Sequence, residues 1–121
     1  MRASRLAMLA LLVISAAGAD ASGVWTLRLL TGSGESAARA TVTLKQDGAK
    51  LTGTCAIDQI DQELAVRGEV EGDRLTWRCV GKDAFEASFT AAIDATGRQM
   101  TGEWATPAAA PGTFKGSRPP K

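Results

Sequence analysis

The two cysteines, Cys55 and Cys79, are the residues whose type most directly suggests chemistry. Both occupy apolar positions of predicted strands that are separated by one further strand. Two strand spacings, about 9 to 10 Å, exceed the usual Cα separation limit of about 7 Å for a disulfide, but barrel curvature brings inward side chains closer. In an oxidising compartment we expect a disulfide. Two buried thiols are the alternative, and a redox site is a third, although there is no Cys-x-x-Cys motif.

Few other residues of this sequence could take part in catalysis. The chain has no histidine, so it cannot form a Ser-His or Cys-His nucleophile pair, an imidazole base or a histidine-bound zinc site. Two cysteines alone cannot provide a tetrahedral metal site, and the carboxylates nearly all fall in turns or at outward positions. We therefore expect a protein that is not an enzyme and that uses no metal or cofactor.

Eight short segments that alternate apolar and polar residues must position these side chains. A period of two is typical of half-buried strands, and turn residues separate each segment from the next. The fold class predicted is all-β, an eight-stranded antiparallel up-and-down (meander) β-barrel, because closure removes exposed edges. The inward residues expected on the successive strands are Trp25, Leu27 and Leu29; Ala40, Val42 and Leu44; Leu51, Gly53, Cys55 and Ile57; Leu64, Val66, Gly68 and Val70; Leu75, Trp77 and Cys79; Phe85, Ala87, Phe89, Ala91 and Ile93; Met100, Gly102 and Trp104; Phe114, Gly116 and Arg118.

The connections predict two different barrel ends. Tight turns are expected at 46–49, 71–73 and 94–97, where Asp and Gly tolerate the required backbone conformations. Longer loops are expected at 31–37, 58–62, 81–84 and 105–111. In a meander these four lie at one end, which makes the long-loop end the candidate binding mouth.

Small and aromatic inward residues near that mouth suggest a ligand site inside the barrel. The candidate lining residues are Ala40, Gly53, Trp77, Phe85, Ala87, Gly102 and Trp104, and such a lining suits a small apolar or aromatic molecule. The alternative is a filled core, since an eight-stranded barrel has room for little more than its own side chains. A filled barrel would act from outside, as a protein-binding module or hydrolase inhibitor through loops 31–37 and 105–111.

Trp25 and Arg118 predict a structural plug at the opposite end. The first and last strands of a closed meander are neighbours, so the guanidinium can lie on the indole ring. Gly23-x-Trp25 followed by an inward Arg118 on the last strand resembles the signature of the calycin superfamily, which includes lipocalins, fatty-acid-binding proteins and avidins. That resemblance spans nearly the whole mature chain and implies a closed barrel with an arginine-covered base.

Within the superfamily, chain length and hairpin pattern are most similar to avidins. Leu51 to Cys55 resembles their third strand, and Trp77 and Trp104 fall on strands that carry biotin-stacking tryptophans. The chain departs from them because it has no tyrosine, and Lys115, Gly116 and Ser117 replace the aspartate segment. Biotin binding is therefore the weaker alternative. The chain also resembles lipocalin-like domains of exported bacterial proteins, a family that implies a fold but no activity.

The first 19 residues have the features of a secretory signal peptide. Arg2 and Arg5 precede an apolar run from Leu6 to Ile14, and Ala17-Gly18-Ala19 fits a cleavage site after Ala19. The apolar run is too short to span a bilayer. Residues 20–121 form one domain, expected in the periplasm or secreted as a monomer. Loss of both arginines lowers the number of basic residues from 14 to 12 against 13 acidic residues, a net charge of −1. Such a balance does not indicate the basic surface that binds nucleic acid.

Overall fold

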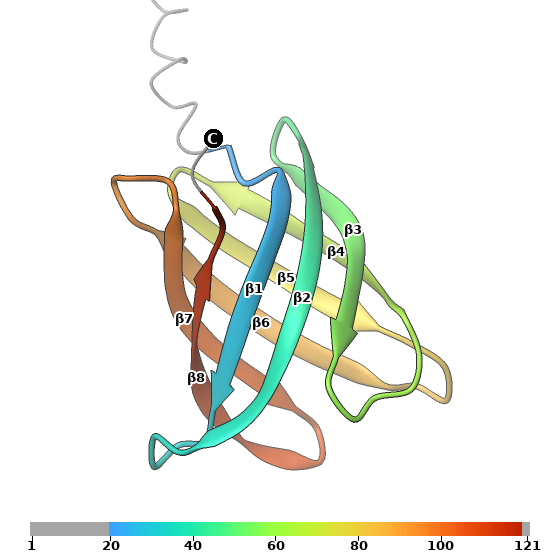
Figure 1. Cartoon of the computed structure of the whole chain (residues 1–121). Coiled ribbons are helices and arrows are strands. Elements are labelled where there is room, and N and C mark those ends of the chain that lie inside the picture. Colours follow the sequence, from blue (N-terminus) through green and yellow to red (C-terminus); the bar gives the residue numbers. More distant parts are fainter. Residues whose placement is uncertain (1–19, 120–121) are drawn as a thin grey trace, which may run out of the picture.

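The computed structural model describes residues 20–119. The predicted signal peptide, 1–19, lies outside these described residues. Eight strands form a closed barrel in which each strand pairs antiparallel with the next and the last pairs with the first (Figure 1). This confirms the predicted eight-stranded meander. The strands are β1 (Gly23–Leu30), β2 (Ser36–Asp47), β3 (Lys50–Ile57), β4 (Leu64–Glu71), β5 (Arg74–Val80), β6 (Glu86–Ile93), β7 (Gln99–Thr106) and β8 (Ala109–Ser117).

The alternation of residue types produces this arrangement because successive strand side chains point to opposite faces. In β1, Trp25 and Leu27 are fully buried, whereas Thr26 and Arg28 on the other face are exposed. The same pattern recurs around the sheet, so one apolar core fills the inside of the barrel. Among the described residues, every buried side chain belongs to a hydrophobic residue type.

The two barrel ends differ as the loop lengths predict. The tight turns after β2, β4 and β6 lie at the end where both termini of the described chain meet (Figure 1). Gly48 supplies the positive φ of +63° that the first of these turns requires. The connections 31–35, 58–63 and 81–85 lie at the opposite end, which we call the long-loop end.

One predicted loop is wrong. Segment 105–111 was expected to be a loop, but β7 runs to Thr106 and β8 begins at Ala109, so only residues 107 and 108 form the turn. A β-bulge after Trp104 makes this extension possible, because one residue of β7 lies opposite two of β8. Pro111 is tolerated there because its missing N–H falls at the bulge rather than within a regular ladder.

Three smaller boundaries also differ from the prediction. The loop expected at 31–37 ends at residue 35, where β2 begins earlier than expected. Phe85 precedes β6 instead of lying within it, and Arg118 follows the end of β8. The Arg118 backbone N–H still donates to the Arg98 carbonyl oxygen at 3.1 Å. Arg118 therefore continues the pairing of β7 with β8 by one residue beyond the strand ends.

Candidate functional site

The seven predicted ligand-lining residues divide into buried and half-buried groups. Ala40, Trp77 and Ala87 are each only 2% exposed. Gly53, Gly102, Phe85 and Trp104 are half-buried. Trp77 lines one surface depression and Gly102 lines another.

The two lining glycines allow close approach of neighbouring backbones. A Cβ atom on Gly53 would lie 1.8 Å from the Thr43 carbonyl oxygen, and one on Gly102 would lie 1.8 Å from the Thr90 carbonyl oxygen. Both clashes are with main-chain atoms of the adjacent strand, which cannot move without breaking the ladder. Glycine at these positions therefore serves barrel curvature.

Aromatic rings fill the middle of the barrel. Trp77 of β5 and Phe89 of β6 stack with their centroids 5.0 Å apart and an interplanar angle of 7°. Phe114 of β8 packs edge-on against both rings, at centroid distances of 5.9 Å and 5.5 Å. We call Trp77, Phe89 and Phe114 the aromatic trio. Trp77 and Phe89 are cross-strand neighbours and Phe114 packs against both, so the three buried rings occupy core space that a ligand would need.

Half-buried apolar side chains close the core towards the long-loop end. Ile57, Ile60, Phe85 and Trp104 pack against the buried cluster. The Trp104 indole N–H donates to the Leu30 carbonyl oxygen at 2.9 Å, which fixes the ring across the β1 end. The mouth is consequently lined by apolar surface that already contacts the core.

The β3–β4 and β5–β6 loops hold an unusual backbone. Gln59, Asp83 and Ala84 have positive φ values of 73°, 58° and 61°, and they are the non-glycine residues with this conformation among those described. For Ala84 the conformation costs about 1 kcal/mol. Strained backbone of this kind concentrates at functional sites. Sequence reasoning missed Gln59 and Ala84 because their residue types carry no signal for positive φ, whereas Asp83 is of a type that tolerates it.

A side-chain hydrogen bond joins the same two loops. The Gln62 Oε1 atom accepts from the Lys82 backbone N–H at 2.8 Å. Gly81 makes this contact possible, since a Cβ there would lie 2.5 Å from both Gln62 Oε1 and Leu64 Cδ2. The two loops therefore form one connected surface.

Cys55 and Cys79 are free, buried thiols in this structure rather than the expected disulfide. They interact across β4, and hydrogen bonding to Cys55 together with burial raises the pKa of Cys79 far above its ordinary range. The Trp77 indole N–H lies beside Cys79, yet the buried Nε1 has no hydrogen-bond partner among the described residues. A neutral thiol is a weak acceptor, which accounts for this unsatisfied donor.

Trp25 and Arg118 form the base of the barrel. The guanidinium carbon lies 4.4 Å from the Trp25 ring centroid, and the Trp25 indole N–H donates to the Ala21 carbonyl oxygen at 2.9 Å. Gly23 has a φ of +136°, which favours glycine at this position, and a Cβ there would make an ordinary contact with an Arg118 terminal nitrogen. The residues thus cover the apolar core at the end opposite the long loops.

The arginine also binds three carbonyl oxygens. It donates to Gly97 at 2.9 Å, to Ser22 at 2.7 Å and to Asp20 at 2.8 Å. Gly97 belongs to the β6–β7 turn, where Thr96 donates to the Asp94 carboxylate and lowers the pKa of that group. Arg118 therefore joins the start of the described chain, this turn and the end of β8.

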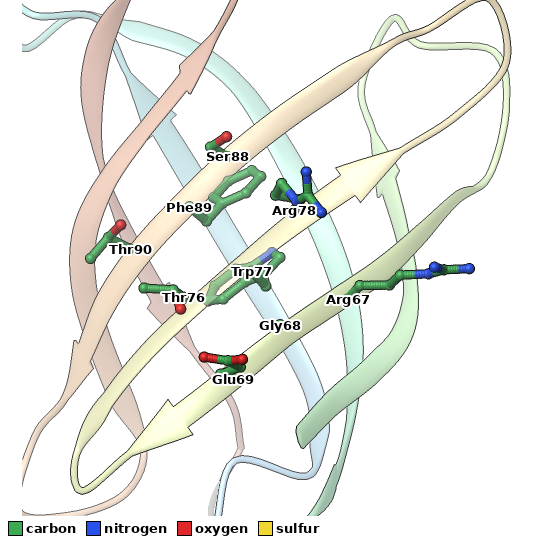
Figure 2. Close-up of a pocket in the computed structure, with 9 residues that line it drawn as sticks. All are labelled: Arg67, Gly68, Glu69, Thr76, Trp77, Arg78, Ser88, Phe89 and Thr90. Atoms are coloured by element: carbon green, nitrogen blue, oxygen red, sulfur yellow. The ribbon is translucent and has the colours of Figure 1, made fainter. Parts of the chain in front are cut away.

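A shallow depression of about 450 Å³ lies on the outer wall of the barrel over β4, β5 and β6. Figure 2 shows Arg67, Glu69 and Arg78 around it, with Trp77 and Phe89 side by side on neighbouring strands. Arg78 is engaged by an ion pair with Glu86 at 3.2 Å. The depression is open to solvent, and Trp77 and Phe89 of the aromatic trio are among the residues that line it.

Within residues 20–119, no group of three His, Cys, Asp or Glu side chains is placed to hold a metal ion. The same residues include no helix that is long and apolar enough to cross a membrane. No known family model matches the chain, and no curated protein matches its sequence. The closed eight-stranded barrel is compatible with a calycin-like fold.

Proposed function

We propose that this protein is an exported, non-enzymatic binding module that uses a calycin-like barrel as a rigid scaffold and contacts a protein partner with its long-loop end. The observation that carries this proposal is the aromatic trio. A barrel whose interior is filled by its own side chains can bind a partner only on its outer surface. Proteins commonly place binding residues on loops held by such a scaffold.

The connected β3–β4 and β5–β6 loops are the contact surface that the geometry favours. Their backbone is held by the Gln62–Lys82 hydrogen bond and includes three positive-φ residues. A preorganised loop loses less conformational entropy on binding than a flexible loop does. Exposed acidic residues outnumber exposed basic residues in these two loops. The acidic residues are Asp58, Asp61, Glu63 and Asp83, and the basic residue is Lys82. A partner with a basic surface would therefore be complementary in charge.

A small apolar ligand at the mouth is the competing proposal. It would have to displace Phe85 or Trp104, which are half-buried and pack on the core. A biotin site finds less support, because it requires several buried polar groups and the described interior has none.

Site-specific photo-crosslinking tests the proposed surface in the exported fraction of the protein's own cells. A photoreactive residue at Asp61 or Asp83 should give the same discrete protein adduct. The matched control position is Asp73, which is also exposed and acidic but lies in the tight turn between β4 and β5. Equal adducts from all three positions, or none from the loop positions, would contradict a protein-binding role for these loops.

A further inference from the structure

Three cationic residues form a row across the outer wall of the barrel, next to its long-loop end. Arg28 of β1 lies directly opposite Arg39 of β2 on one side and Lys115 of β8 on the other. All three are exposed, and Figure 1 shows β2, β1 and β8 side by side. At strand spacings of about 4.8 Å, the three Cα atoms span roughly 10 Å.

This row is unfavourable for the isolated protein. Like charges directly opposite each other on neighbouring strands destabilise a sheet. Glu103 of β7 and Asp58 after β3 are the closest acids in the register, yet the one ion pair found within residues 20–119 joins Arg78 and Glu86. Asp58 lies opposite Arg39, because its backbone N–H donates to the Arg39 carbonyl oxygen at 2.9 Å. Arg28 and Lys115 have no acid directly opposite them on a neighbouring strand of the described barrel.

Two other cross-strand pairs of the same barrel join opposite charges. Lys50 of β3 faces Glu69 of β4, and Glu71 of β4 faces Arg74 of β5. Where Arg67 of β4 faces Arg78 of β5, Arg78 has an ion pair with Glu86. The row on β2, β1 and β8 differs from these pairs, because it joins three cations and none of them has an ion pair among the described residues. An external anion would remove the repulsion.

A second row, of hydroxyl groups, runs beside the cations. Thr26 lies opposite Thr41 on one side and Ser117 on the other. Each hydroxyl residue is two positions from a cation on the same strand and points to the same face. The surface therefore offers positive charges and hydrogen-bonding hydroxyls in two parallel lines; we call it the cation–hydroxyl surface.

We propose that the cation–hydroxyl surface binds an anionic polysaccharide. Its carboxylate, sulfate or phosphate groups would contact the cations, and its sugar hydroxyls would bond to the threonines and serine. Bases of single-stranded nucleic acid stack on aromatic side chains, whereas Val24 is the one large hydrophobic residue exposed among those described. The strands that form the surface carry Arg28, Arg39, Lys45 and Lys115 against a single acid, Asp47.

Fluorescence anisotropy with a labelled heparin oligosaccharide tests the proposal at low ionic strength. The double variant Arg28→Gln/Lys115→Gln should bind roughly 5- to 30-fold more weakly, as expected for the loss of two exposed ionic contacts. The control variant Lys50→Gln/Arg74→Gln removes the same charge from other outward positions and should change binding less than twofold. Thr26→Val keeps the side-chain shape and should weaken binding without changing its salt dependence.

Three results would overturn the proposal. Equal losses in the two double variants would show a general charge effect, and absence of heparin binding by the native protein would remove the site. Binding of the native protein to phosphatidylglycerol vesicles, lost in Arg28→Gln/Lys115→Gln while heparin binding is not, would assign the surface to a membrane instead. Circular dichroism confirms that each variant is folded.

Discussion

Arg118 acts at the scale of a single residue, because its five donors engage a ring and three carbonyl oxygens at once. We expect Arg118→Ala to lower the free energy of unfolding by roughly 2 to 4 kcal/mol, through the lost cation–π contact and three hydrogen bonds. Urea unfolding followed by tryptophan emission measures the change. Arg98→Ala, which removes an exposed arginine from the neighbouring turn, should change stability by less than about 0.5 kcal/mol. Similar values for both variants would show that the plug contributes little.

The thiol pair makes a second residue-scale prediction. The folded pair should release at most one proton where the unfolded chain releases two, because the pKa of Cys79 is raised above its ordinary value of 9.0. The stabilisation is present below pH 9 and is lost as the pH rises above it. Denaturant unfolding of the reduced protein from pH 8 to 10 should show this decline, and the Cys55→Ala/Cys79→Ala variant should lack it.

Alkylation determines the oxidation state to which that prediction applies. Denaturation without reductant should allow two adducts per chain, since the structure has free thiols. A chain that accepts no adduct would show that Cys55 and Cys79 become bridged in the cell, and the pH dependence would then appear only after reduction.

At the scale of the strands, backbone proximity decides which positions tolerate a side chain. Gly102→Ala should destabilise the barrel by roughly 2 to 4 kcal/mol, because its Cβ would collide with the Thr90 carbonyl oxygen of β6. Gly34→Ala is the matched control: its φ is +91°, but nothing lies within 4 Å of the added atom, so it should cost about 1 kcal/mol. Thermal unfolding of both variants compares the clash with the conformational cost alone.

For the molecule as a whole, the important question is whether a small ligand can bind inside the barrel. We expect an environment-sensitive apolar dye to show no saturable binding to the native protein, since the aromatic trio occupies the centre. Ala87→Phe should destabilise the barrel by about 1 to 3 kcal/mol, because Ala87 is buried in a packed core. Saturable dye binding that quenches Trp77 or Trp104 and is abolished in a stable Ala87→Phe variant would instead support the internal ligand site.

The order of residue types determined the fold of this protein to a large extent. Alternation with a period of two, interrupted by Asp and Gly, predicts eight strands because side-chain direction in a strand is a local property. It also predicts that Trp25 and Arg118 meet, since closure makes the first and last strands neighbours. The extension of β7 and β8 through 105–111 was missed, because a bulge depends on how two strands match and not on either strand alone.

Only the tertiary structure decided what the inward residues do. Gly53 and Gly102 suggest open space in the sequence, but each lies against a neighbouring carbonyl oxygen. Trp77, Phe89 and Phe114 come from three strands, and their stacked and edge-on contacts depend on the stagger between those strands. The cation row on β2, β1 and β8 has the same origin, because register brings together Arg28, Arg39 and Lys115. Interactions between residues distant in sequence require the relative position of whole strands, which no local pattern contains.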